Sequence, residues 1–486
     1  MSKQPAAYPA TPAAQHPSFA RFAQDLAIQR QAYHANPVPT LAQRLADLDA
    51  LKALVRDNEA ALVAAVNADY GSRCRFETRF SEILMVLEDI ARTKKQLKKW
   101  LKPQRRHIDR LLFPTSGCKV LPQPLGVVGV IVPWNFPIML SLSPLVAIFA
   151  AGNNAMVKMS ENSEQLAQLL LKLVPQYFPP AKLQVFADDA GSGPAFSAQP
   201  FDHLFFTGSA QTGRAVMASA AQNLTPVTLE LGGKSPAVVA PDFPLDKAAD
   251  RILWAKAFNA GQICTNIDYL FLPQGSEQQF TELALKLVAQ RYPDINSNDY
   301  TAIIDQRAYQ RLQTTLDDAI AKGATAVNLM PGQTADPALR KFPLTLLFNV
   351  SDDMLVMQRE IFGPLLPVKS YQQSADVISY INSKPRPLAF YPFSHDKALQ
   401  QHYISQIMSG GVTVNHAILH VGQHDLPFGG IGDSGMGHYH GYEGFLTFSK
   451  LRPVFYQGAY NSVSMLLPPY GKLAEKMTDW LIKLKG

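Results

Sequence analysis

The chain has 486 residues, a formal net charge of +6, 47% hydrophobic and 17% charged residues. These values are typical of a globular protein with more than one hydrophobic core, and no uncharged apolar run is long enough to suggest a membrane-spanning helix. The three cysteines, Cys74, Cys118 and Cys264, are too far apart for a paired metal-ligand motif or a disulfide framework. We therefore expect no metal site and a reducing, cytoplasmic setting.

Residues 1–17 are rich in Ala and Pro without an apolar signal-peptide core, which predicts a disordered lead-in. Apolar residues at helical spacing predict an amphipathic helix over 41–68, and the pattern continues over 77–101. A basic cluster within 94–106 is interpreted as a solvated helix face rather than a nucleic-acid site.

An alternation of short apolar strands and helices follows. The strands are predicted at 126–132, 154–159, 183–187, 203–209 and 227–231, with helices at 140–152, 163–174 and 212–221. This pattern is typical of an α/β fold with a parallel sheet and helices on both faces. Ligands bind such sheets at the carboxyl ends of the strands. A second α/β region is predicted over 232–436, followed by a possible strand at 446–456.

Cys264 lies in the segment GQICTN, after a predicted helix over 245–258. A lone Cys is more often a small buried hydrophobe, and an unperturbed thiol is only about 3% ionised at neutral pH. A nucleophilic Cys needs a nearby base. Glu230 is the candidate, because it ends an apolar strand just before Gly232 and Gly233; the alternative is a salt-bridged or capping Glu.

Two further segments carry candidate polar groups. Asn135 lies between two prolines after a buried strand, where its amide could bind a developing oxyanion or could simply form a turn. FTGSAQTG (206–213) joins a strand to a helix and resembles a dinucleotide phosphate turn, although it lacks the three-glycine form.

Together these segments resemble the aldehyde dehydrogenase superfamily, over roughly residues 40–470 and in the family's order. The matching motifs are PWNFP (133–137), VKMSE (157–161), FTGS (206–209), ELGGKSP (230–236), GQIC (261–264), EIFGP (360–364) and PFGGIGDSGMG (427–437). The details look most like the class 3 branch, and 411–430 is similar to coniferyl aldehyde dehydrogenases in particular.

The resemblance implies a complete mechanism. Cys264 attacks the aldehyde carbon, and the oxyanion is held by the Asn135 amide and the Cys264 backbone N–H. Oxidation by NAD, with NADP possible, leaves a thioester, and Glu230 activates the water that hydrolyses it. The expected substrate is an aromatic or cinnamyl aldehyde such as coniferyl aldehyde, or a medium-chain or long-chain aliphatic aldehyde.

The resemblance also implies the cofactor contacts. Lys158 and Glu161 match positions that hold the adenosine ribose, and Glu360 and Phe362 match those beside the nicotinamide ribose and ring. Gly208, Ser209 and Gly213 match the pyrophosphate turn. The sequence departs from the family's usual residues at Met159, Asp188, Asp189, Thr265, Asn266, Ile267 and His416, which bears on cofactor affinity and substrate identity.

Three parts are expected from the resemblance. They are an NAD(P)-binding Rossmann-like domain (18–116 and 126–231), a catalytic domain (232–436), and a bridging element that pairs two subunits into a homodimer (117–125 and 437–486). Two alternatives are a Cys enzyme on the same scaffold that transfers or hydrolyses acyl groups, and a non-catalytic binding protein. Glu360, Phe362 and Gly208 argue against an enzyme without redox chemistry, and Glu230 argues against acyl transfer. The presence of Asn135, Glu230 and Cys264 together argues against a binding protein.

The ending 472–486 places five apolar residues along one helical stripe with lysines around it. Three interpretations remain open. The stripe packs on its own domain, makes weak peripheral membrane contact, or forms a lid near the substrate tunnel.

Overall fold

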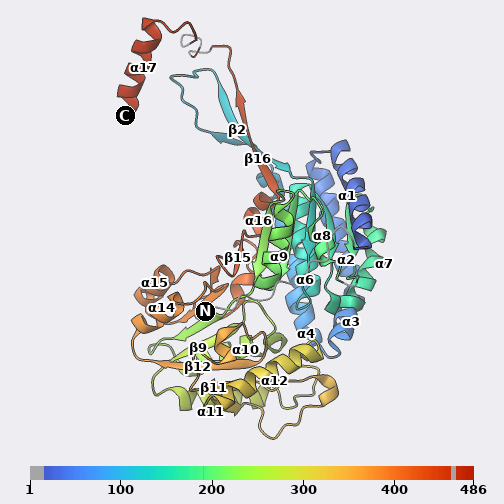
Figure 1. Cartoon of the computed structure of the whole chain (residues 1–486), viewed down its shortest axis with the longest axis vertical. Helices are drawn as coiled ribbons and strands as arrows, with labels where there is room; N and C mark the ends of the chain where they lie inside the picture. Colours follow the sequence, from blue (N-terminus) through green and yellow to red (C-terminus); the bar gives the residue numbers. More distant parts are fainter. Residues whose placement is uncertain (1–15, 190, 461–462, 464–466) are drawn as a thin grey trace.

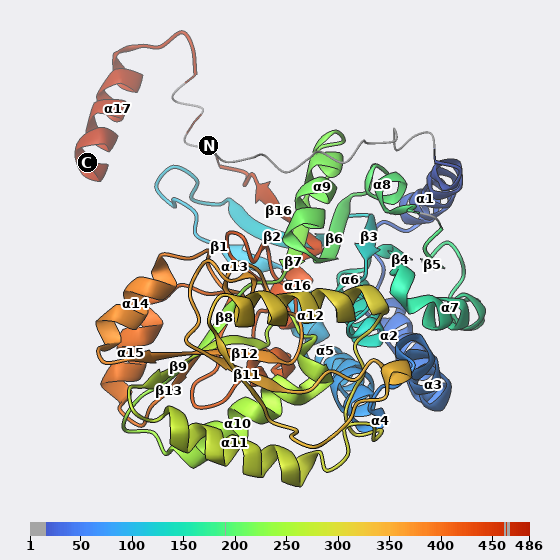
Figure 2. The ribbon, with the colours of Figure 1, turned by 60° about the horizontal axis from the view of Figure 1, so that its bottom comes forward.

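The computed structural model describes residues 16–189, 191–460, 463 and 467–486. Residues 1–15 of the predicted lead-in lie outside the described residues. Three sheets organise the chain: one of six strands, one of seven, and one of three (Figures 1 and 2). The predicted α/β class is confirmed.

The six-stranded sheet has the order β15-β7-β6-β3-β4-β5, and all its strands are parallel except β15. Its strands are β3 (Val127–Ile131), β4 (Asn154–Lys158), β5 (Leu183–Phe186), β6 (His203–Gly208), β7 (Val227–Leu231) and β15 (Gly435–Met436). The five strands predicted from the sequence therefore form, each within about one residue of its expected end.

Helices cover both faces of this sheet. They are α1 (Ser18–Ala35), α2 (Leu41–Asp57), α3 (Glu59–Tyr70), α4 (Arg75–Thr78), a π-helical turn (Arg79–Leu84), α5 (Met85–Trp100), α6 (Pro137–Ala151), α7 (Glu164–Tyr177), α8 (Gly193–Ser197) and α9 (Ala210–Ala221). Successive side chains of β3 point to opposite faces of the sheet, which shows why both faces of the sheet are apolar. Val127 and Ile131 pack with α1, α8 and α9, whereas Val128 and Val130 pack with α2, α3 and α5 to α7.

The prediction of one continuous helix over 41–68 is wrong about its continuity. The chain forms two helices that meet at Asn58, whose backbone is non-helical (φ −119°, ψ 16°). The Asn58 amide donates to the Leu54 carbonyl at 2.9 Å, which satisfies the end of the first helix. The apolar periodicity of the sequence continues across this break, because both helices bury apolar residues in the same core.

The seven-stranded sheet has the order β10-β11-β12-β9-β8-β13-β14 and is parallel except for β10. Its strands are β8 (Ser235–Val239), β9 (Ile267–Pro273), β10 (Thr325–Asn328), β11 (Thr345–Phe348), β12 (Leu365–Tyr371), β13 (Ala389–Phe393) and β14 (Gly411–Val412). Its helices are α10 (Leu245–Ala257), α11 (Glu277–Arg291), α12 (Gln306–Ala321), α13 (Leu355–Gln358), α14 (Ser374–Asn382) and α15 (Lys397–Gln406).

The three-stranded sheet forms an arm that extends from the rest of the chain (Figure 1). In it β2 (Gly117–Pro124) pairs antiparallel with both β1 (Gln104–Arg106) and β16 (Ser449–Tyr456). Helix α16 (Gly441–Thr447) precedes β16, and helix α17 (Lys472–Lys485) lies at the far end of the arm. No helix in the described part of the chain is long and apolar enough to cross a membrane.

Candidate active site

Glu230 lies near the carboxyl end of β7, between two neighbouring strands. It is in register with Thr207 of β6 on one side and Gly435 of β15 on the other. The side chain is 3% exposed, and neither carboxyl oxygen has a hydrogen-bond partner among the described residues. Burial raises the pKa of Glu230 well above its ordinary value. Among the described residues, Glu230 therefore neither forms a salt bridge nor caps a helix.

The loop before Cys264 has an unusual backbone. Asn259, Ala260 and Gly261 are consecutive and all have positive φ, at 51°, 49° and 76°. A Cβ on Gly261 would lie 2.3 Å from the Gly363 carbonyl oxygen, so only Gly fits there. This turn, between α10 and β9, sets where the Cys264 side chain lies.

Cys264 is half-buried and free. Burial, followed by the charges of Glu360 and Glu230, raises the pKa of its thiol to about 12. These effects place both carboxyl groups near the sulfur. A thiol in this setting is protonated at neutral pH and needs a base to become a nucleophile.

Asn135 is held firmly in the loop after β3. Its backbone carbonyl accepts hydrogen bonds from the Arg73 guanidinium at 2.7 Å, the Tyr70 hydroxyl at 3.0 Å and the Asn259 amide at 3.2 Å. Its side-chain amide donates to the Gln262 carbonyl at 3.3 Å, which uses one of two amide hydrogens. Asn135 and the Cys264 turn are thus joined through shared partners.

Sequence reasoning missed the groups that hold this turn. Glu77 accepts from the Asn259 backbone N–H at 3.1 Å and from the Thr301 hydroxyl at 2.7 Å. Arg73 pairs with Glu82 at 3.3 Å, and both side chains are fully buried. The signal available was the occurrence of charged residues among predicted core positions, because such residues are buried only with partners.

The residues matched to the adenosine ribose lie at the end of β4. The Lys158 ammonium pairs with the Asp188 carboxylate and also donates to the Met159 carbonyl at 3.2 Å. Glu161 follows in a short 3₁₀ turn and accepts from the Ser160 hydroxyl at 3.1 Å. Asp188 departs from the family pattern. Its carboxylate pairs with Lys158, the cation beside which a ribose would bind.

The remaining departures have structural explanations. Met159 is fully buried in the core, and Thr265 and Ile267 are buried as well. The Asn266 amide donates to the Ala255 carbonyl at 3.0 Å. His416 packs edge-on against Trp254 with ring centroids 5.5 Å apart.

The strand-to-helix turn after β6 has both packing and capping roles. Added Cβ atoms would lie 2.6 Å from the Phe206 ring at Gly208 and 2.6 Å from a Leu231 methyl at Gly213. The Ser209 hydroxyl caps α9 by accepting from the Thr212 backbone N–H at 3.2 Å. The N-terminus of α9 therefore approaches the sheet edge, where its free N–H groups can bind phosphate.

Glu360 lies beside the turn that follows Glu230. It accepts a hydrogen bond from the Gly233 backbone N–H, and its Oε1 has no partner among the described residues. A Cβ on Gly232 would overlap its carboxylate at 2.1 Å. Burial, with the charge of Asp268, raises the pKa of Glu360 to about 8. Phe362 has a positive φ of 49° and packs against Trp134 at 5.4 Å.

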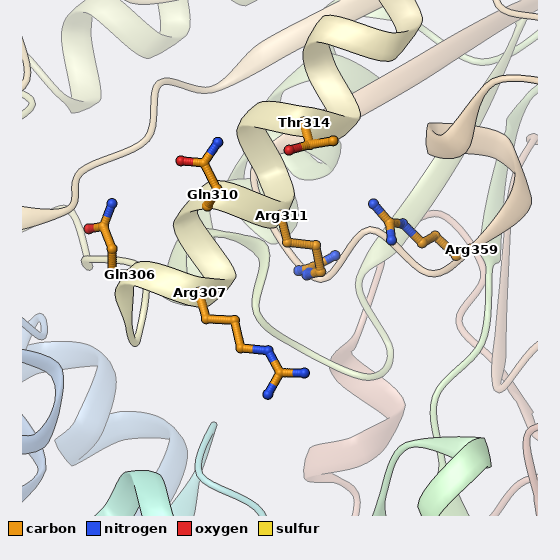
Figure 3. A pocket seen from close by; sticks show the side chains of 6 residues that line it. All are labelled: Gln306, Arg307, Gln310, Arg311, Thr314 and Arg359. Carbon is orange, nitrogen blue, oxygen red and sulfur yellow. The ribbon is translucent and has the colours of Figure 1, made fainter. Parts of the chain in front are cut away.

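Two arginines join the segment around Glu360–Phe362 to α12. Arg311 donates to the Ile361 carbonyl at 2.8 Å and the Phe362 carbonyl at 3.2 Å. Arg359 donates to the Thr315 hydroxyl at 2.9 Å. These two side chains line an open cavity of about 540 Å³ with Gln306, Arg307, Gln310 and Thr314 (Figure 3).

The residues fit a dinucleotide. Carboxylates that suit ribose hydroxyls lie at two places, Glu161 and Glu360, and the second has a buried oxygen without a partner. A capped helix N-terminus lies at the same sheet edge. Within the described residues, no cluster of three or more His, Cys, Asp or Glu side chains could hold a metal ion.

Comparisons with known proteins agree with this geometry. The profile described as "Aldehyde dehydrogenase family" matches residues 14–454. The chain is 49% identical to the "Probable coniferyl aldehyde dehydrogenase" of Pseudomonas aeruginosa, covering 92% of this chain and 94% of that protein. It is 44% identical to the "Coniferyl aldehyde dehydrogenase" of Pseudomonas sp. strain HR199, covering 91% and 92%.

Two more distant proteins bear on cofactor and fold. The dog protein "Aldehyde dehydrogenase, dimeric NADP-preferring" is 35% identical and covers 90% of this chain and 94% of its own length. Among solved structures, the substrate-bound state of Staphylococcus aureus AldH matches with a TM-score of 0.88 and 31% identity, covering 94% of this chain and 99% of that one.

Proposed function

Because the chain belongs to the aldehyde dehydrogenase family, we propose that Cys264, Glu230 and Asn135 carry out its reaction. The enzyme oxidises an aldehyde to the carboxylic acid and depends on NAD(P). The observation that supports these residue roles is the buried carboxyl of Glu230, which has no hydrogen-bond partner among the described residues and lies near the Cys264 thiol.

The first step forms a bond between the Cys264 sulfur and the aldehyde carbon. The thiol proton passes to the Glu230 carboxylate, directly or through water, and the raised pKa of Glu230 makes that carboxylate a stronger base than an ordinary one. The aldehyde oxygen becomes an oxyanion, which accepts hydrogen bonds from the second Asn135 amide hydrogen and the Cys264 backbone N–H. The Arg73, Tyr70 and Asn259 contacts hold Asn135 in place for this role.

Bound NAD(P)⁺ supplies the acceptor for the two electrons and the hydrogen that leave the aldehyde carbon, and a thioester remains on Cys264. Seven residues would hold the cofactor: Lys158, Glu161, Gly208, Ser209, Gly213, Glu360 and Phe362. Glu161 would accept a hydrogen bond from the adenosine ribose and repel a 2′-phosphate, so NAD is preferred to NADP.

Hydrolysis completes the reaction. Glu230 first releases the thiol proton to solvent and then removes a proton from water, whose oxygen attacks the thioester carbon. The carbon–sulfur bond breaks, and the proton on Glu230 passes to the leaving thiolate to regenerate the Cys264 thiol. The balance is one aldehyde, one NAD(P)⁺ and one water converted to one carboxylic acid, one NAD(P)H and one proton. This use of Glu230 disfavours transfer of the acyl group to another thiol, which requires water to be excluded.

For the substrate we propose an aromatic aldehyde of the cinnamyl class. The two curated relatives at 49% and 44% identity carry the name coniferyl aldehyde dehydrogenase. In this chain, Cys264 packs against a hydrophobic cluster that includes Phe258, Phe428 and Tyr439, and Trp134 packs against the same cluster. A conjugated planar aldehyde suits such surroundings.

Initial rates of NAD(P)H formation test the proposal. Aliphatic, benzylic and cinnamyl aldehydes should each be assayed with NAD and with NADP. We expect the highest kcat/KM for the cinnamyl aldehydes with NAD. No cofactor reduction with any aldehyde would contradict the residue roles, and a preference for medium-chain aliphatic aldehydes would contradict the substrate class.

We also propose a homodimer formed through the arm. Its last strand, β16, exposes Leu451, Phe455 and Tyr456, with exposed fractions of 39%, 48% and 47%. Large exposed side chains along one strand are typical of a surface that pairs with a partner. The arm extends away from the two larger sheets, which leaves it accessible to a second copy.

A further inference from the structure

Three histidines and a tyrosine in the segment 413–440 have no part in the proposed mechanism. We refer to His420, His424, Tyr439 and His440 as the imidazole cluster. His424, Tyr439 and His440 are buried, with exposed fractions of 6%, 1% and 1%. The His440 ring lies 5.7 Å from that of His424 and 4.3 Å from that of Tyr439, measured between centroids.

The polar atoms of this cluster are buried without hydrogen-bond partners among the described residues. They are His420 Nε2, both ring nitrogens of His424, both ring nitrogens of His440, and the Tyr439 hydroxyl. Buried polar groups in proteins are nearly always paired with protein, water or ligand. Six such atoms in one cluster therefore point to a polar guest.

The Thr413 hydroxyl oxygen accepts from the His420 backbone N–H at 3.2 Å and lies 2.8 Å from His420 Nδ1, with which it also forms a hydrogen bond. Burial lowers the pKa of His424 to about 4 and that of His440 to about 3. Each neutral ring then offers one donor and one acceptor.

The cluster begins beside the reactive groups. Burial raises the pKa of Tyr439, and the charges of Glu230 and Cys264 add to that effect, which places the ring near both groups. Phe428 and Tyr439 exchange two backbone hydrogen bonds of 2.8 Å, and the strand between them pairs with Glu230 through Gly435. The Phe428 ring stacks on His440 at 5.7 Å. An apolar ring thus lies alongside the polar atoms, as an aromatic guest requires.

We propose that the imidazole cluster binds the ring hydroxyl of a phenolic aldehyde whose carbonyl carbon lies at Cys264. This inference rests on the proposed oxidation of cinnamyl aldehydes. A neutral imidazole nitrogen accepts the phenol hydrogen, and an imidazole N–H or the Tyr439 hydroxyl donates to the phenol oxygen. Because the rings are uncharged, the cluster binds a neutral hydroxyl group and forms no hydrogen bond with an alkyl chain.

Three cinnamaldehydes that differ only at the para position test the proposal with the wild-type enzyme. They carry a hydroxyl, a methoxy group or hydrogen. The methyl ether can accept a hydrogen bond but cannot donate one. We expect kcat/KM to be about tenfold higher for the hydroxyl compound than for either of the others, the effect of one hydrogen bond.

Variants identify the residues. His440→Phe and His424→Phe keep an aromatic ring and remove both nitrogens, and Tyr439→Phe removes a single oxygen. His395→Phe is the matched control, because His395 is an exposed histidine that packs on Phe243 away from the cluster. We expect the cluster variants to lose about tenfold in kcat/KM with the hydroxyl compound only, with unchanged thermal unfolding for Tyr439→Phe.

The outcomes separate the two levels of the proposal. Oxidation of all three compounds with equal efficiency, or an equal loss with all three in each cluster variant, would overturn the role of the imidazole cluster alone. A wild-type enzyme that oxidises other aldehydes but none of the three would overturn the proposed substrate class and this inference together. If the histidine variants do not fold, Tyr439→Phe and the wild-type comparison still decide.

Discussion

At the scale of single residues, the proposed chemistry rests on two acidic groups, the Cys264 thiol and the Glu230 carboxyl. Cys264 and Glu230 each have a raised pKa, and burial is the main cause for both. Holding a carboxyl out of water without a hydrogen-bond partner costs folding free energy, and such groups with shifted pKa values cluster at functional sites.

Replacing Cys264 with Ala should abolish aldehyde oxidation, because no other thiol lies beside Glu230 and Asn135. Cys74→Ala and Cys118→Ala serve as controls and should keep most activity, since Cys74 is buried near Thr301 and Cys118 lies in the arm. Steady-state NAD(P)H formation checks this. Strong oxidation by Cys264→Ala would exclude a thioester mechanism.

Glu230→Gln should slow thioester hydrolysis by about 10²–10⁴-fold, the usual contribution of a general base. Intact mass spectrometry after mixing with aldehyde and NAD(P) should show the trapped acyl-enzyme. In the wild type, Glu230 acts only when ionised, and its raised pKa moves the acid limb of the deacylation profile to higher pH. A wild-type rate for Glu230→Gln, or an acid limb at the ordinary pKa of a glutamate, would contradict this role.

At the scale of elements, we expect the ends of β4 and β5 to decide cofactor preference. Asp188 follows β5 and pairs with Lys158 at the end of β4. Because Lys158 is paired with Asp188, it is not free to bind a 2′-phosphate. The carboxylates of Asp188 and Glu161 would repel that phosphate.

Asp188→Asn should therefore favour NADP, with its Kd falling about tenfold relative to that of NAD. Calorimetric titration of the enzyme with each cofactor measures this without turnover. Asp189→Asn is the control, because Asp189 is exposed and accepts from the Ser18 hydroxyl instead of Lys158. Equal Kd ratios in the wild type and Asp188→Asn would show that the ion pair does not set the preference.

The left-handed turn before Cys264 is the second element that decides function. Gly261→Ala adds a Cβ that lies 2.3 Å from the Gly363 carbonyl and places Ala at a φ of 76°. Overpacking and left-handed backbone together should cost about 2–5 kcal/mol of unfolding free energy, and should displace Cys264.

Gly275→Ala provides the matched control for that change. Gly275 also has a positive φ, at 87°, but nothing lies within 4 Å of an added Cβ. Denaturant unfolding and kcat should show a larger loss for Gly261→Ala than for Gly275→Ala. Similar losses in both would mean that the contact with Gly363 is unimportant.

At the scale of the whole molecule, the arm and α17 are the parts whose surfaces the described chain leaves open. In α17, Leu473, Trp480 and Leu484 have exposed fractions of 63%, 52% and 58%, whereas Met477 and Leu481 are half-buried. Packing on its own domain, one of the interpretations of the apolar stripe, does not hold for these three residues. In the proposed dimer, a partner subunit would cover these exposed side chains.

Deletion of residues 474–486 should therefore weaken the dimer, measured by sedimentation at several protein concentrations. If α17 also forms a lid for the partner's substrate tunnel, the KM for cinnamyl aldehydes should rise while that for acetaldehyde stays unchanged. Unchanged sedimentation with lost liposome binding would instead support the membrane interpretation.

The sequence by itself determined the class of fold, the strands that follow each other in the first sheet, and the family. Short apolar runs between turn residues specify buried parallel strands locally, and the motifs around Glu230 and Cys264 are contiguous in the chain. Only the tertiary structure decided how Asn135 and the Cys264 turn are held, because Tyr70, Arg73 and Glu77 reach them from a distant helix and loop. Likewise, the pairing of Lys158 with Asp188 and the gathering of unpartnered imidazoles depend on which side chains meet after burial. Hydrogen bonds and charges between residues far apart in sequence leave no periodic pattern, so they become visible only once the chain is folded.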